Sequence, residues 1–175
     1  MFALGLASGY GAHELGHAVV ATAKGYKVSH DGLSIVYPDA AFTDADRLQV
    51  ASAGFQTQWL MAELALRKHD ESNGNNWPSD GLKVRQEPPG NFAAGVVCAH
   101  LGITLAYLTV LKNHQQGDVA GIAAATRRSN DQVALTLAIP GALDAWRLFG
   151  NRVPEWVPQL SVLSKGLEMA WAWTY

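Results

Sequence analysis

Long apolar runs alternate with short polar segments along this chain, and the runs have the length of helices. The first run, 2–23, is apolar apart from one short motif and ends at Lys24-Gly25, a pair typical of a helix end. Within it, Gly5 and Gly9 form a small-xxx-small pair that would let a second helix approach closely. Small residues are also tolerated at such positions without any contact, so the pair alone predicts only that close packing is permitted.

Four more segments have the pattern of helices. The run 92–111 is about 20 residues long and carries no charged side chain. Because a hydrocarbon core demands this length, the run is the clearest transmembrane candidate. The other three helices are expected at about 47–68, 133–149 and 156–173. The segment 156–173 has tryptophans near both ends, as in the aromatic belt of membrane proteins.

A β-hairpin is expected between the first two helices. Segment 26–37 has β-branched and aromatic residues around an Asp-Gly pair, the strongest short hairpin signal. Asp44 or Asp46 can then cap the next helix. Residues 69–90 are polar and rich in turn residues, so we expect a loop that separates two apolar halves of the chain.

Composition places these segments in one domain, 1–175. Hydrophobic residues make up 49% of the chain and charged residues only 16%, whereas a typical soluble domain has about 25% charged residues. We therefore expect a mainly α fold, a bundle of about four to five largely apolar, transmembrane helices with the short hairpin after the first. The mean hydropathy of +0.01 is low for such a bundle, so a compact soluble fold stays open.

Charge and cysteine content exclude two kinds of partner or site. The formal net charge is -2, and no basic block occurs, so nucleic acid is excluded as an expected partner. The single Cys98 excludes an internal disulfide and a cysteine-rich zinc knuckle.

The chemistry is concentrated in His13-Glu14-Leu15-Gly16-His17. Positions four apart lie on one face of a helix, so the two imidazoles can bind one metal ion together. Glu14 lies one step round the same helix, where it can take a proton from water without being a ligand. The spacing predicts a hydrolytic metal site, and the alternative is a buried helix whose histidines have hydrogen-bond partners.

A zinc site with two histidines needs a third protein ligand and an open position for water. Asp144 is the first choice, because a carboxylate within the apolar segment 135–145 is costly unless a cation meets it. A salt bridge to Arg147 would be the alternative. Glu63 can act instead, although it can also pair with Arg67. The further candidates, ranked behind these, are His100 and the loop residues His69, His114 and Asp118.

Three strings occur in an order that is familiar from one family. The HELGH string is followed by the expected hairpin, then by AGFQTQ at 53–58, then by LDAWRL at 143–148. The chain thereby resembles the site-2 protease family of intramembrane zinc metalloproteases, which has HExxH, a short β element, AGPxxN and LDG in this order. It departs from the family pattern at Phe55 in place of proline and at Gln58 in place of asparagine. An Ala-Trp pair follows Asp144 where the family has glycines.

The resemblance implies peptide-bond hydrolysis in or beside a membrane, with Zn²⁺ held by the two motif histidines and Asp144. Glu14 would be the general base, and Gly54 and Gln58 would bind the substrate. The implied partners are a peptide or membrane-protein substrate and the lipid bilayer, and the implied location is integral to a membrane, for which we expect a bacterial inner (plasma) membrane. The strand edge near 34–37 could pair with an extended substrate segment.

Two other functions stay open at this point. One is a soluble or peripheral zincin peptidase that uses Glu63 as the third ligand. The other is a non-catalytic membrane scaffold that retains the motif. Histidine and carboxylate ligands also suit iron, cobalt or nickel, so zinc is preferred by ligand type alone.

Overall fold

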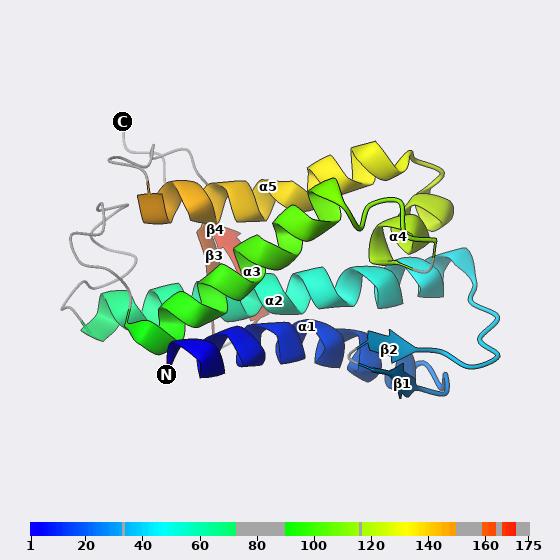
Figure 1. Cartoon of the computed structure of the whole chain (residues 1–175), viewed down its shortest axis with the longest axis horizontal. Coiled ribbons are helices and arrows are strands. Elements are labelled where there is room, and N and C mark those ends of the chain that lie inside the picture. The colour runs from blue at the N-terminus through cyan, green and yellow to red at the C-terminus, as the bar shows by residue number, and fades with distance from the viewer. Residues whose placement is uncertain (33, 73–89, 116, 150–158, 164–165, 171–175) are drawn as a thin grey trace.

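The computed structural model describes residues 1–32, 34–72, 90–115, 117–149, 159–163 and 166–170. Within these residues the chain forms five helices and two antiparallel two-stranded hairpins. Helices α1 and α2 lie side by side, α3 packs on both at an angle, and α5 packs mainly on α3 (Figure 1). The elements are α1 (Phe2–Ala23), β1 (Ser29–Asp31), β2 (Ser34–Val36), α2 (Asp44–Ser72), α3 (Asn91–Thr109), α4 (Asp118–Thr126), α5 (Asn130–Phe149), β3 (Gln159–Leu163) and β4 (Gly166–Ala170).

Most of the expected elements are confirmed, and three expectations are wrong, the third being the cap of α2 described below. The mainly helical fold and the hairpin within 26–37 are present, and Gly32 at the turn has a φ of 62° that suits glycine. The expected helix over 156–173 is wrong, because its described part forms the β3–β4 hairpin. Asp118, expected in a loop, instead begins α4. Of the loop expected over 69–90, residues 73–89 lie outside the described residues.

The N-terminal half of α1 packs directly on α3 through glycines. A Cβ atom added at Gly5 would lie 3.0 Å from the Cα of Gly95 and would collide with the Phe92 carbonyl oxygen. A Cβ atom at Gly9 would lie 2.6 Å from the Cβ of Ala99. The small-xxx-small pair therefore marks a true helix contact, and it fixes α1 where its C-terminal half can meet α2.

A capping box fixes the start of α2. The Thr43 hydroxyl accepts a hydrogen bond from the Asp46 backbone N–H at 3.1 Å and donates to the Asp46 carboxylate at 2.8 Å. Asp46 also accepts from Lys24 Nζ at 2.6 Å and from the Tyr26 hydroxyl at 2.9 Å. The cap is thus Thr43, and neither Asp44 nor Asp46 takes that position. Asp46 ties the end of α1 to the start of α2.

One described helix, α3, is long and apolar enough to cross a bilayer. It matches the expected span at 92–111, and a third of its most apolar stretch is buried within the protein. The other described helices fall short of the same measure, so a bundle of spanning helices remains a proposal.

Candidate metal centre

The two motif histidines project from one face of α1 toward α2. Their rings meet edge to face with centroids 4.8 Å apart, and the two Nε2 atoms are 3.2 Å from each other. Only 2% of His13 and 3% of His17 is exposed. The helix therefore aims both ring nitrogens at one point inside the protein, as their spacing of four residues predicts.

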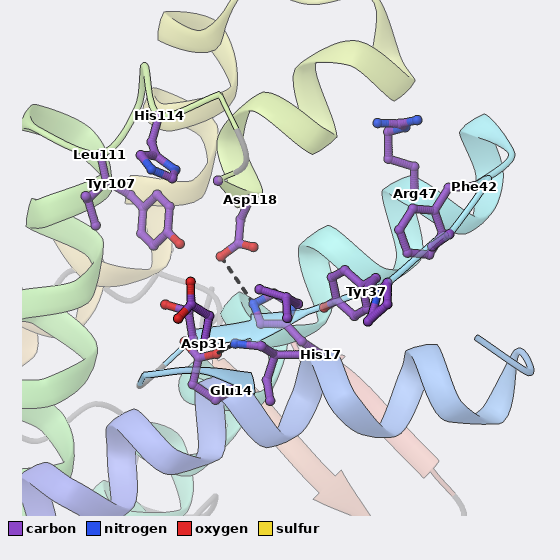
Figure 2. Close-up of a pocket in the computed structure, with 16 residues that line it drawn as sticks. Glu14, His17, Asp31, Tyr37, Phe42, Arg47, Tyr107, Leu111, His114 and Asp118 are labelled. Carbon is purple, nitrogen blue, oxygen red and sulfur yellow. Dashed lines mark hydrogen bonds and ion pairs between the residues drawn. The ribbon is translucent and has the colours of Figure 1, made fainter. Parts of the chain in front are cut away.

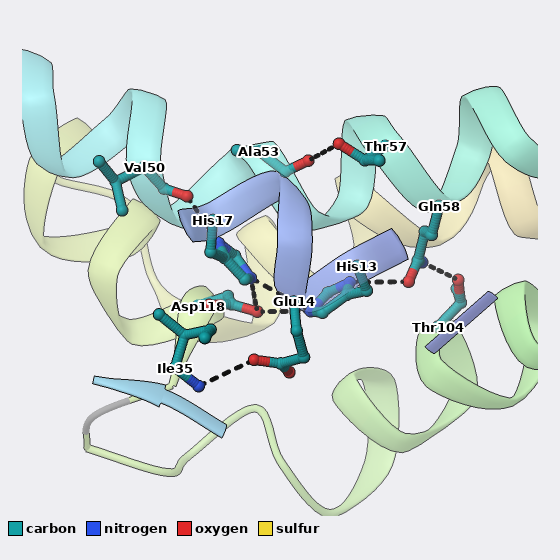
Figure 3. A network of polar contacts seen from close by, with 10 residues as sticks. All are labelled: His13, Glu14, His17, Ile35, Val50, Ala53, Thr57, Gln58, Thr104 and Asp118. Carbon is teal, nitrogen blue, oxygen red and sulfur yellow. Dashed lines mark hydrogen bonds and ion pairs between the residues drawn. The ribbon is translucent and has the colours of Figure 1, made fainter. Parts of the chain in front are cut away.

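Asp118 completes the cluster from the first turn of α4. Its Oδ2 atom lies 3.1 Å from His13 Nε2 and 3.2 Å from His17 Nε2 (Figure 3). A tetrahedral zinc ion with ligands at about 2.0–2.1 Å separates its ligand atoms by about 3.3–3.4 Å. The three described donor atoms form a nearly equilateral triangle of that size. Histidine nitrogen and carboxylate oxygen are also ligands that zinc accepts, so the residues fit the ion by both size and chemistry.

Each imidazole is oriented by a hydrogen bond at its other ring nitrogen. His17 Nδ1 lies 2.7 Å from the Val50 carbonyl oxygen, and His13 Nδ1 lies 2.8 Å from Gln58 Oε1. Because an oxygen of either kind can only accept, Nδ1 carries the hydrogen in both rings and Nε2 is left with a lone pair. Gln58 Nε2 donates to Thr104 Oγ1 at 3.4 Å, which agrees with this orientation of the amide.

Two lone pairs and a carboxylate oxygen facing one another at these distances repel unless a cation lies between them. Asp118 reinforces the point. Burial disfavours its ionised form, but hydrogen bonds from Nε2 of His13 and His17, which form when the imidazoles are protonated, outweigh that effect and hold the pKa of its carboxyl well below the usual range. The cluster is therefore built for a positive charge, either a metal ion or a proton.

Gly54 makes room for the cluster on α2. A Cβ atom at this position would lie 2.4 Å from His17 Nε2 and 2.8 Å from His13 Nε2. Gln58, one turn later on the same face, is 1% exposed and lies behind His13. The family resemblance implies that both residues contact the substrate. Their placement behind the imidazoles is instead that of residues that shape and orient the candidate metal centre.

The structure does not bring Asp144 to the imidazoles. Asp144 is 1% exposed, and its Oδ2 lies 3.5 Å from His100 Nε2, so it faces α3 from α5. This differs from the expectation that Asp144 is the third ligand, since the position next to the imidazoles is taken by Asp118. Glu63 is nearly buried on α2 and does not belong to the His13, His17 and Asp118 cluster either.

Two further candidates for the third ligand are His69 and His114. The His69 side chain lies outside the described residues. His114 lines the same hollow as Asp118 without joining the cluster. A usable signal for Asp118 existed in the sequence, because it follows Gly117 at the start of the apolar segment DVAGIAAAT. A carboxylate at the edge of an apolar run also needs a cation or a hydrogen-bond donor if the fold buries it.

A cleft of about 810 Å³ opens beside the cluster. The cluster residues His17 and Asp118 line it, and Figure 2 shows them between Tyr107 on one side and Tyr37 on the other. The Tyr107 ring packs on Phe55, with centroids 5.0 Å apart. The two imidazoles therefore each have a hydrogen-bond partner that fixes their orientation, and Tyr107 lies beside Asp118 in the cleft.

Glu14 lines the same cleft, but its carboxylate is turned toward the hairpin. Its Oε2 atom accepts a hydrogen bond of 2.9 Å from the Ile35 backbone N–H (Figure 3). The cleft is thus lined by the candidate cation site, by the Glu14 carboxylate and by the edge of β2.

Comparisons of the chain with models of protein families, with curated proteins and with solved structures found no match.

Proposed function

We propose that the protein is a membrane-embedded zinc metalloprotease, whose zinc is held by His13, His17 and Asp118. The observation that carries the proposal is the triangle of Nε2, Nε2 and Oδ2 atoms with edges of 3.1 and 3.2 Å, at the floor of an open cleft. The donor set leaves one tetrahedral position free, which is typical of a catalytic zinc site. The resemblance to the site-2 protease family points to the same activity.

The side chains of the cleft have separate tasks in this proposal. A bound zinc ion would supply Lewis acidity, which acidifies water and polarises the scissile carbonyl. The Glu14 carboxylate would accept the proton of the attacking water and deliver it to the leaving amine nitrogen. Gln58 and the Val50 carbonyl would keep the imidazoles in the tautomer that can ligate.

A peptide fits the cleft better than a small rigid substrate. One wall is the edge of β2, and an extended peptide can add to such an edge as a further strand. The other walls carry the aromatic side chains of Tyr37, Phe42 and Tyr107, which suit apolar substrate side chains. A membrane-protein segment would have to unwind before it could bind, because helical hydrogen bonds shield its carbonyls.

The proposed location rests on apolar surfaces. Besides α3, helix α1 exposes 60% of Leu15 and 57% of Val19, and α5 exposes 62% of Leu135 and 56% of Ile139. Large side chains of this kind are stable in contact with lipid and costly in contact with water. The bilayer is therefore the proposed partner of these faces.

Hydrolysis by the zinc-loaded protein in lipid vesicles tests the activity. We expect the protein to cleave quenched fluorescent peptides, and Glu14→Gln to lower kcat by about 100-fold or more while zinc stays bound. The matched control is Asp44→Asn, which neutralises an exposed carboxylate outside the cleft lining and leaves kcat unchanged. A native protein that binds zinc and cleaves nothing would instead support the scaffold alternative.

A further inference from the structure

The expected general base is engaged in a contact that catalysis does not require. The Glu14 carboxylate accepts the hydrogen bond from the Ile35 N–H. Burial and the nearby Glu14 carboxylate raise the pKa of the Tyr10 hydroxyl, one turn earlier on α1. Figure 3 shows the carboxylate directed at β2 and away from the cluster of Asp118 and the imidazoles.

The N–H that Glu14 occupies belongs to the free edge of β2. Strand β2 pairs with β1 in the register Ser29↔Val36, His30↔Ile35 and Asp31↔Ser34, and the described sheet contains these two strands alone. Alternate residues of a strand direct their N–H groups to opposite edges. Since the Ile35 N–H points to Glu14, it points away from β1, at the centre of the edge that a third strand would use.

We propose that Glu14 is latched to Ile35 in the substrate-free protein, and that an extended peptide backbone releases it by taking the Ile35 N–H for itself. The inference rests on the proposed function, because it assigns a regulation to the same cleft. A carbonyl oxygen of the peptide replaces the carboxylate oxygen as the acceptor. The freed carboxylate then stands beside the cleft without its backbone donor, in position to accept a proton.

The latch links substrate length to activity. A peptide long enough to pair with β2 breaks the contact between Glu14 and Ile35, whereas a dipeptide that reaches only the cluster leaves it intact. The partly buried Glu14 carboxylate is kept from the reaction until a peptide strand pairs with the edge of β2. Long extended segments are thus the substrates that activate the protein.

Binding of a non-cleavable peptide tests the latch without any hydrolysis. The probe is a six-residue apolar peptide whose central amide is reduced to an amine, added to the zinc-loaded protein in vesicles. We expect Glu14→Ala to bind it about tenfold more tightly than the native protein, because no charge-assisted hydrogen bond has to be broken first. Asp44→Ala, which removes an exposed carboxylate outside the cleft lining, should leave the affinity unchanged. An unchanged or weakened affinity in Glu14→Ala would overturn the proposal.

Hydrogen exchange of the Ile35 amide gives a second readout. We expect this amide to exchange slowly in the native protein, about tenfold faster in Glu14→Ala, and slowly again in Glu14→Ala once the peptide is bound. Equal exchange rates in the native protein and Glu14→Ala would contradict the latch. Because neither readout needs turnover, a protein that cleaves nothing would refute the protease proposal and still leave the latch decided by these data.

Discussion

Replacing Gly54 by alanine should remove the metal site while leaving the helices in place. The added Cβ atom would lie 2.4 Å from His17 Nε2, 2.7 Å from His13 Cε1 and 2.8 Å from His13 Nε2. Ordinary contacts of a Cβ atom begin near 3.4 Å, so the His17 ring must move by about 1 Å. Since ligand distances in metal sites tolerate only about 0.2 Å, we expect zinc affinity to fall by about 100-fold or more.

Zinc affinity measured by competition with a chromogenic chelator checks this expectation. Gly11→Ala is the matched control, because it lies two residues before His13 on α1 and an added Cβ atom has no neighbour within 4 Å. It should bind zinc normally and gain up to about 1 kcal/mol of stability from the better helix former. Gly54→Ala should lose about 1–3 kcal/mol from overpacking and still unfold cooperatively. Native zinc affinity in Gly54→Ala would refute the reasoning.

Two further substitutions test a contact that orients His13 and a contact that joins α1 to α2. Gln58→Leu removes the acceptor at His13 Nδ1, so chelator competition should show zinc binding weaker by about 10–100-fold; an unchanged affinity would contradict the orienting role of Gln58. Hydrogen bonds from Lys24, Thr43 and Tyr26 lower the pKa of Asp46 to about 2, so the stability that this carboxylate contributes is fully present above its ordinary pKa and is lost as pH falls through about 2. The melting temperature of Asp46→Asn should therefore lie below that of the native protein at pH 6, and the two should converge toward pH 2; a difference that persists there would contradict this assignment.

The local parts of the site could be predicted from the sequence because they depend on local geometry. Residues four apart on a helix share a face, which places His13 and His17 together whatever surrounds them. The hairpin follows in the same way from an Asp-Gly pair whose glycine has a positive φ. Gly54 and Gln58 are also four apart, so their common face was predictable. That this face supports the imidazoles from behind depends on how α2 packs against α1.

The third cluster residue depends on tertiary packing, which the pattern does not contain. Asp118 lies at the start of an apolar run and Asp144 lies within one, so each carboxylate needs a cation or a hydrogen-bond donor when it is buried. In the folded chain Asp118 contacts the two motif histidines, whereas Asp144 contacts His100. The likeness of 143–148 to a family motif favours Asp144, whereas the local sequence offers Asp118 only the weaker signal of an acid at the start of an apolar run.

The error at the C-terminal end has a different cause. The segment 156–173 is predicted to be a helix because it is a further apolar run with tryptophans near its ends. Within it, Leu160 and Val162 alternate with Gln159 and Ser161, and Leu167 and Met169 lie on either side of Glu168. This period of two is typical of strands, and the described strands β3 and β4 follow it.

We expect Asp118 and the two motif histidines to hold one zinc ion. The zinc content of purified, zinc-exposed Asp118→Asn and Asp144→Asn, each compared with the native protein after the same dialysis, tests this directly. One zinc per chain is expected in the native protein and in Asp144→Asn, and a loss of zinc is expected in Asp118→Asn. Retention of zinc in Asp118→Asn together with its loss in Asp144→Asn would contradict it.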